Sequence, residues 1–294
     1  MKKLKGWKYD LKNNVYVQND FSIGQLDDQL GTDQHGDVKN RQNYDPNFCR
    51  WNNSFEMAQH VRFATVMTWI RSRLSYIGEL EGKKRKKVLI DLGCSRSFIY
   101  RRWKGNMNFW GWPLLHYWGV DSSLKRINEG RKEFVKKKND SLVYFVGDLN
   151  KFMKFPGKAD IIICLETLEH IPEENVRNLF NTFRFNLREN GLVIMSSPNP
   201  KEEDGWVWGE ESKGSHHKEY TWEEAKILFS KNRFEVVDHT GVLPYRNYHH
   251  KSSFGKLRSE LVKHFPSAWI NNILLLAEPD MKMKQQWLCS LRKK

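Results

Sequence analysis

The chain has 294 residues, with 49 lysines and arginines against 35 aspartates and glutamates, a formal net charge of +14. This length allows one large domain, or one domain with an appended segment, and the 39% hydrophobic share is ordinary for a globular protein. No apolar run approaches the roughly 20 residues that a membrane helix needs, and none follows the basic N-terminus. We therefore expect neither a membrane span nor a signal peptide.

The four cysteines are far apart and form no Cys-x-x-Cys pair, which argues against a zinc knuckle and suits a reducing, cytoplasmic protein. The excess of positive charge attracts polyanions, so RNA, DNA or a nucleotide is a candidate partner. The same excess can also serve solubility alone, because short lysine runs such as residues 136–138 are usually solvated.

Residues 1–53 are rich in Asn, Asp, Gln and Gly and show no sustained periodicity, so we predict a mostly irregular N-terminal arm. From Ser54 onward apolar residues recur at helical spacing, which predicts a helical cap over residues 54–82. A third segment, residues 83–294, follows a basic linker and contains the remaining pattern.

Apolar runs and helical patterns alternate through this third segment. Continuous apolar runs are typical of strands that are buried on both faces of a sheet. They predict strands at 88–91, 117–121, 142–148, 159–165 and 191–196, with later strands near 234–238 and 270–277. Between them, one helix is expected to run from about residue 173 to a left-handed cap at Asn190 and Gly191. Another begins with a capping box, Thr221 with Glu224. This alternation predicts an α/β fold, a doubly wound and mostly parallel sheet.

Four acids lie at or just after successive predicted strand ends: Asp91, Asp121, Asp148 and Glu166. In an open parallel sheet, ligands bind beyond the carboxyl ends of the strands, so we expect these acids to surround one crevice. Gly93, two residues after the first of them, allows a tight turn and a close approach of ligand to backbone.

At these positions the chain resembles the class I S-adenosylmethionine-dependent methyltransferases. Residues 88–94 look like their first motif, residues 119–121 like the motif whose acid holds the ribose, Gly147 and Asp148 like the adenine-contacting position, and residues 196–200 like the loop after the fifth strand. The resemblance implies a seven-stranded Rossmann-like sheet within residues 83–294, with insertions near 104–116 and 200–220. It also implies S-adenosylmethionine as cofactor, bound by Asp91, Gly93, Cys94, Ser95, Asp121, Ser122, Asp148, Leu149 and Glu166.

The chain departs from that family pattern at Ser95 and Ser97, where members usually carry further glycines. These serines also argue against a nicotinamide cofactor, because a pyrophosphate needs an open glycine loop at the helix N-terminus.

The segment Glu166-x-x-Glu169-His170 places three potential ligands close together. It resembles segments of ubiquinone-pathway O-methyltransferases and of small-RNA terminal 2′-O-methyltransferases, in which such residues hold a divalent metal with a later histidine. The resemblance implies Glu166, Glu169, His170 and His217 as ligands of magnesium or manganese, with Glu169, His170 and His217 catalytic; His216 is an alternative to His217. The other interpretation is that His170 orients the loop or acts as a base, and Glu166 lines the cofactor pocket.

The sequence therefore predicts a methyltransferase that acts on an oxygen or nitrogen atom, with a slight preference for a nucleic acid or nucleotide acceptor. Two alternatives stay open at this point. One is a small-molecule O-methyltransferase, and the other is a catalytically degenerate methyltransferase fold that serves as a nucleic-acid-binding or partner-binding module.

Overall fold

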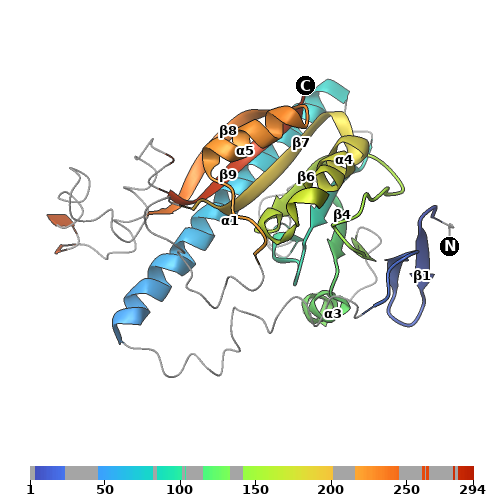
Figure 1. The fold of residues 1–294 in the computed structure, drawn as a ribbon, viewed down its shortest axis with the longest axis horizontal. Helices are drawn as coiled ribbons and strands as arrows, with labels where there is room; N and C mark the ends of the chain where they lie inside the picture. Colours follow the sequence, from blue (N-terminus) through green and yellow to red (C-terminus); the bar gives the residue numbers. More distant parts are fainter. Residues whose placement is uncertain are drawn as a thin grey trace.

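A computed structural model of the chain describes residues 4–23, 46–81, 85–100, 103, 115–132, 142–200, 216–244, 260–261, 263–264, 281 and 284–294. Side chains are described in α1 from Arg62 onward, in β8 to Val242 and in β9 from Gln286. The structure is built on one sheet of nine strands covered by helices on both faces (Figure 1).

The sheet has the order β1-β2-β5-β4-β3-β6-β7-β9-β8. Its strands are β1 (Trp7–Asp10), β2 (Val15–Gln18), β3 (Lys87–Leu92), β4 (Leu115–Asp121), β5 (Leu142–Val146), β6 (Ala159–Leu165), β7 (Leu187–Pro198), β8 (Phe234–Pro244) and β9 (Lys284–Lys293). The helices are α1 (Pro46–Glu81), α3 (Leu124–Lys132), α4 (Val176–Asn186) and α5 (Trp222–Lys231), with short 3-10 turns η2 (Leu168–His170) and η3 (Glu173–Asn175).

The five strands β5, β4, β3, β6 and β7 run parallel, and β9 is antiparallel between β7 and β8. These seven strands form the predicted doubly wound α/β sheet, and the predicted fold class is confirmed. Parallel strands have all their carboxyl ends at one edge, which brings the residues after β3, β4, β5 and β6 together.

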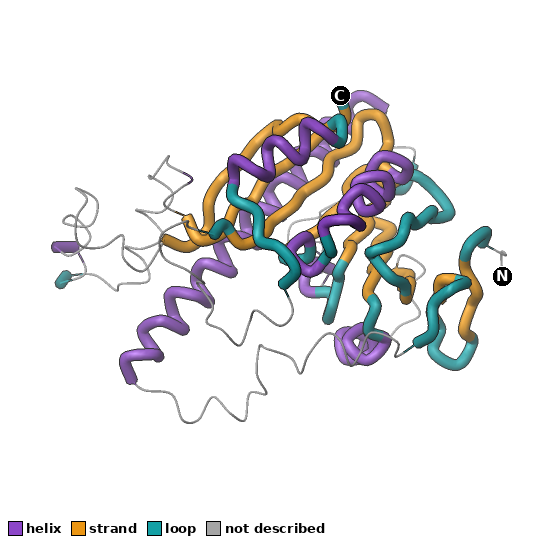
Figure 2. Tube along the Cα trace, in the orientation of Figure 1, coloured by secondary structure: helices purple, strands orange, loops and turns teal. Residues whose placement is uncertain are grey.

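Alternate residues of each strand enter two separate cores. On one face, Ile90 and Ile162 pack with α4 and α5. On the other, Leu89 and Ile161 pack with α1 and α3. Figure 2 shows these helices on either side of the strands. The sheet is thus buried on both faces, which explains why its strands read as continuous apolar runs.

The N-terminal segment differs from the predicted irregular arm. Residues 7–18 form an antiparallel hairpin, β1 and β2, and β2 extends the sheet by pairing in parallel with β5. The helical cap also begins earlier than predicted, at Pro46. The hairpin strands have only four residues each, too short for their alternation to stand out in the sequence, and it is the edge of β5 that gives β2 its partner.

The start of α5 was predicted correctly, whereas the end of α4 was not. The capping box of α5 is confirmed, because the Thr221 hydroxyl accepts from the Glu224 backbone and the Glu224 carboxylate accepts from the Thr221 backbone. The predicted cap at Asn190 and Gly191 is wrong, because α4 ends at Asn186 and the buried Leu187 already pairs with β6. The expected strand near 270–277 and most of the two expected insertions lie outside the described residues, and the ninth strand follows at 284–293.

None of the helices that the structure describes is long and apolar enough to cross a membrane.

Candidate active site

In the loop after β3, three alternate residues have a left-handed backbone. Gly93 has φ +76°, Ser95 +46° and Ser97 +59°. The two serines thus adopt the backbone conformation in which glycine is favoured, at a cost of about 1–2 kcal/mol each. The substitution of glycine by serine therefore does not abolish the turn that the resemblance predicted.

Gly93 itself is required by space as well as by conformation. A Cβ at this position would lie 2.3 Å from the Oγ1 atom of Thr167, in the loop after β6. The amides of Gly93 and Cys94 both donate to the Val120 carbonyl at 2.9 Å, which ties the loop to β4. The first turn is therefore enclosed between the loops after β4 and β6.

Asp121 ends β4 and is almost completely buried. One carboxylate oxygen accepts from the Ser95 amide at 2.8 Å and the other from the Ser123 amide at 2.9 Å. Asp121 therefore organises the loops after β3 and β4 at once. Ser122, the residue between these contacts, is half-buried beside it.

Asp91 is buried at the end of β3 and accepts a hydrogen bond from the Tyr117 hydroxyl. Burial raises the pKa of Asp91 to about 7, against the opposing effect of the Tyr117 hydrogen bond, and the nearby Asp121 raises it further. Burial also raises the pKa of the Cys94 thiol well above its ordinary value. This edge of the sheet therefore contains a buried carboxyl that a cationic ligand would help to ionise.

Asp148 follows β5 at the same edge. Its carboxylate accepts from the Asn150 amide at 2.9 Å, which closes a tight turn that includes the half-buried Leu149. The preceding residue, Gly147, donates its amide to the Asp121 carbonyl at 3.1 Å. The backbone thus links the predicted ribose-binding acid to the predicted adenine-contacting position.

Glu166 follows β6 with an unusual φ of +47°. It accepts from the Ser196 hydroxyl at 2.6 Å and from the Gln286 amide at 2.9 Å, and its Oε1 atom lies 3.0 Å from the Arg62 guanidinium of α1. The carboxylate is thus held by β7, β9 and α1 together.

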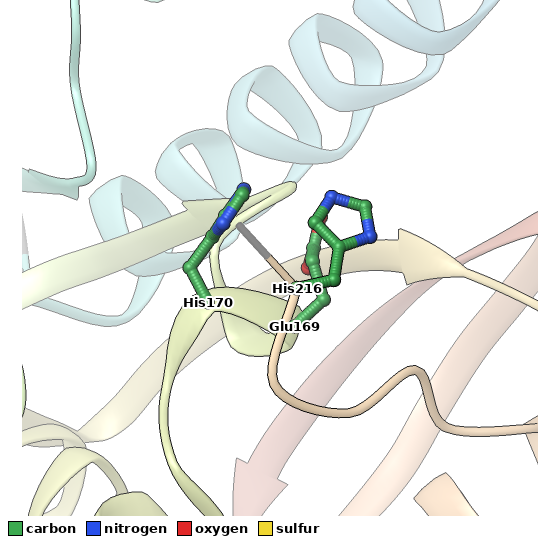
Figure 3. A group of neighbouring side chains, drawn as sticks. All are labelled: Glu169, His170 and His216. Carbon is green, nitrogen blue, oxygen red and sulfur yellow. The ribbon is translucent and has the colours of Figure 1, made fainter. Parts of the chain in front are cut away.

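Glu169, His170 and His216 form a second cluster, with one potential ligand atom from each within 4.8 Å of the others. Figure 3 shows the two imidazoles and the carboxylate converging from η2 and from the segment before α5. The imidazole centroids of His170 and His216 are 4.7 Å apart, and the Nδ1 atom of His216 is 2.7 Å from the Glu219 carboxylate. The Glu219 carboxylate thus orients the His216 imidazole through its Nδ1 atom, as carboxylates behind metal-binding histidines do.

Glu169 is buried and accepts a hydrogen bond from the Ser197 hydroxyl at 2.9 Å. Burial raises its pKa well above the ordinary range, and the charge of Glu166 acts in the same direction. A cation beside Glu169 would therefore stabilise its ionised form.

The cluster differs from the predicted ligand set at two positions. Within the described residues, Glu166 and His217 are outside it and His216 is inside it. Glu166 is engaged by Ser196, Gln286 and Arg62, as described above. The His217 amide donates to the Glu169 carbonyl at 2.7 Å, and its side chain is exposed whereas that of His216 is half-buried. Adjacent histidines cannot be ranked by sequence spacing, because only the direction of the backbone decides which one points inward.

Sequence reasoning missed three residues that shape the site, namely Arg62, Gln286 and Gln18. For Arg62 a signal was present, since an arginine within the apolar stripe of a helix must find a buried partner. Gln286 lies in the unpredicted strand β9, and Gln18 lies in the unpredicted hairpin.

Comparison with known proteins places this geometry in a family. The family model described as a methyltransferase domain matches residues 58–244. Among solved structures, magnesium protoporphyrin IX methyltransferase from Synechocystis, with bound S-adenosylhomocysteine, is 14% identical with a TM-score of 0.50, over 84% of this chain and 94% of that one. A search of the curated proteins finds no match.

Two further structures are similar over a smaller part of their own length. Phosphoethanolamine N-methyltransferase 2 from Haemonchus contortus is 15% identical with a TM-score of 0.47, over 76% of this chain. A structure described as a pericyclic reaction enzyme is 9% identical with a TM-score of 0.48, over 72% of this chain. The chain spans 52% and 44% of the lengths of these two proteins.

The family model covers well over half of the chain, so the chain belongs to the methyltransferase-domain family. The prediction that the chain is a methyltransferase-family protein is thereby confirmed, and the likeness to the Synechocystis structure agrees with the predicted fold.

Proposed function

We propose that this chain binds S-adenosylmethionine at the carboxyl ends of β3, β4 and β5 and transfers its methyl group to an oxygen or nitrogen atom of an acceptor beside Glu169, His170 and His216. The observation that carries the proposal is that Asp91, Asp121 and Asp148 gather at the carboxyl ends of the adjacent parallel strands β3, β4 and β5, and that Glu169 and His170 follow β6 at the same edge. The similar structure from Synechocystis, which contains bound S-adenosylhomocysteine, supports this choice of cofactor.

The proposed cofactor suits the charge at this edge of the sheet. S-adenosylmethionine is a sulfonium cation, and Asp91 and Asp121 supply buried carboxyls at the ends of adjacent strands. We assign Gly93, Cys94 and Ser95 to the backbone around the methionine part, Asp121 and Ser122 to the ribose, and Asp148 and Leu149 to the adenine. Glu166 then lines the far side of the methionine part.

In the proposed reaction the methyl group leaves the sulfonium sulfur and bonds to the acceptor, and S-adenosylhomocysteine is released. The enzyme chiefly aligns the acceptor with the methyl group and takes up the proton that the acceptor loses. We assign the uptake of this proton to His216, whose Nδ1 atom lies 2.7 Å from the Glu219 carboxylate that orients the ring.

The cofactor assignment is tested by titration calorimetry with S-adenosylhomocysteine. We expect binding by the wild-type chain and a loss of at least tenfold in affinity for Asp121→Ala, since that carboxylate organises two loops of the site. Exposed Asp238→Ala is the matched control and should bind normally. An absence of binding by the folded wild-type protein would refute the assignment.

The charge of +14 favours an anionic acceptor, and we extend the proposal to a nucleic acid or nucleotide. Labelled cofactor incubated separately with total RNA, DNA and a metabolite extract would identify the acceptor class. Label in the metabolites alone would contradict this extension and leave methyl transfer itself intact. Nucleic-acid binding without cofactor binding would instead favour the degenerate-fold alternative.

A divalent cation held by Glu169, His170 and His216 is the alternative role that we propose for this cluster, in place of proton uptake by His216. One buried carboxylate and two imidazoles form a mixed oxygen and nitrogen donor set that suits manganese, iron or zinc better than magnesium. The carboxylate of Glu219 behind His216 is the kind of outer partner that metal-binding histidines use. When bound, the cation would polarise the hydroxyl of the acceptor.

The adjacent histidines provide a matched pair for testing the cation. Manganese chloride titrated into the protein and followed by electron paramagnetic resonance should show one site in the wild type and in His217→Ala, and none in His216→Ala. Equal binding by all three proteins would exclude the proposed ligand set. A reaction insensitive to EDTA would assign His216 to proton transfer instead.

A further inference from the structure

The N-terminal hairpin ends beside the proposed adenine end of the cofactor site. Strand β2 runs parallel to β5, with Tyr16 opposite Phe145 and Val17 opposite Val146. Because parallel strands share the direction of their carboxyl ends, Gln18 at the end of β2 lies next to the loop that follows β5. Figure 1 shows the hairpin, in dark blue, at the outer edge of the sheet.

Gln18 makes a direct contact with that loop. Its side-chain oxygen accepts from the Asp148 amide at 3.0 Å. A Cβ on Gly147 would lie only 2.9 Å from the same oxygen, so the absence of a side chain at Gly147 permits this approach. The loop is therefore held on one side by Asp121, through the Gly147 amide, and on the other side by Gln18.

Two further contacts hold the hairpin against the rest of the domain and so keep Gln18 in place. The indole of Trp7 is nearly buried, donates to the Lys154 carbonyl at 2.7 Å and stacks on Phe155 with ring centroids 5.5 Å apart. At the hairpin turn, the Asn13 carbonyl accepts from the Arg131 guanidinium of α3 at 2.5 Å. Movement of Gln18 away from the loop would disturb both anchors.

We propose that Gln18 is a positioning residue of the cofactor site, and that the β1–β2 hairpin forms the outer wall of its adenine end. This inference rests on the proposed function. By fixing the Asp148 amide, Gln18 sets the direction of the Asp148 carboxylate, which accepts from the exocyclic amine of adenine. Hypoxanthine has a carbonyl in place of that amine, so correct aim of Asp148 should favour adenine over hypoxanthine.

The test compares S-adenosylhomocysteine with S-inosylhomocysteine by titration calorimetry. In Gln18→Met the side chain keeps its length but loses its strong acceptor. We expect S-adenosylhomocysteine to bind roughly tenfold more weakly, because the hydrogen bond that aims Asp148 is lost, while the affinity for S-inosylhomocysteine changes little. The ratio of the affinities for S-adenosylhomocysteine and S-inosylhomocysteine should therefore fall in this variant. Leu11→Ala, at an exposed position in the same hairpin, should match the wild type for both ligands.

Three results would overturn the inference. Unchanged affinity for S-adenosylhomocysteine in Gln18→Met would show that the contact does not matter for binding. An equal loss for both ligands would show that the hairpin supports the fold without aiming Asp148. A wild-type protein that binds neither ligand would refute both the proposed function and this inference. If the wild type binds S-adenosylhomocysteine, the proposed cofactor site stands and the Gln18→Met result tests the inference alone.

Discussion

Asp91 gives the protein a buried carboxyl with a pKa of about 7, against 3.8 for an ordinary aspartate. Between these values the folded state retains a proton that the unfolded state releases, so raising the pH favours unfolding. The resulting loss of folding stability begins near pH 4 and is complete above pH 7. For the fully buried group it amounts to at most about 4 kcal/mol.

We therefore expect Asp91→Asn to remove this part of the pH dependence. In urea unfolding at pH 5, 6, 7 and 8, the free energy of unfolding of the variant should rise relative to that of the wild type as the pH rises. Asp10→Asn is the control: hydrogen bonds from Asn13 lower the pKa of Asp10, so this half-buried carboxyl is already ionised over this range. Parallel curves for wild type and Asp91→Asn would mean that Asp91 is ionised in the folded protein.

Gly93 combines a left-handed backbone with a Cβ position 2.3 Å from Thr167. Gly93→Ala should lower the free energy of unfolding by about 2–4 kcal/mol, from overpacking together with backbone strain. Adding Thr167→Ala should recover the overpacking part and leave about 1 kcal/mol of strain. Ser95→Gly in the same loop should instead stabilise by up to about 1 kcal/mol. Failure of the double variant to recover any stability in urea unfolding would locate the cost elsewhere.

At the scale of elements, Asp160 joins the starts of β3 and β6. It is completely buried, accepts from the Val88 amide at 2.8 Å and forms a bidentate pair with Arg85. Asp160→Ala should cost roughly 3 kcal/mol in urea unfolding, because it removes a completely buried carboxylate that accepts from the Val88 amide and from Arg85.

The control for Asp160 is Glu235→Ala, which breaks an exposed ion pair with Arg292 between β8 and β9. That change should cost less than about 1 kcal/mol, since surface pairs gain little in water. Similar costs for the two variants would contradict a structural role for the buried pair.

For the whole molecule, the charge of +14 sets the expected response to salt. If the acceptor is RNA, methyl transfer should weaken by roughly tenfold or more between 50 and 200 mM KCl, because bound phosphates release counterions. Cofactor binding, measured under the same conditions, should change much less and serves as the internal control. A salt-insensitive reaction would point to a small, weakly charged acceptor.

Much of the molecule was predictable from local pattern. Strands buried on both faces are continuous apolar runs, and the acids that end them identify one edge of the sheet, so Asp91, Asp121 and Asp148 could be found without coordinates. The capping box at Thr221 was equally local, since it depends on residues three apart.

Contacts between distant segments were decided only by the tertiary structure. The hairpin forms because β5 offers an open edge, and Gln18 acquires its contact with Asp148 from 130 residues away. His216 lies in the cluster instead of His217 because the backbone beside Glu169 turns one side chain inward and the other outward. Arg62 reaches Glu166 only because α1 crosses the sheet. The sequence by itself determined the class of fold and the edge of the sheet at which its acids gather, since both follow from local periodicity. The side chains that surround the site depend on long-range packing, which periodicity does not encode.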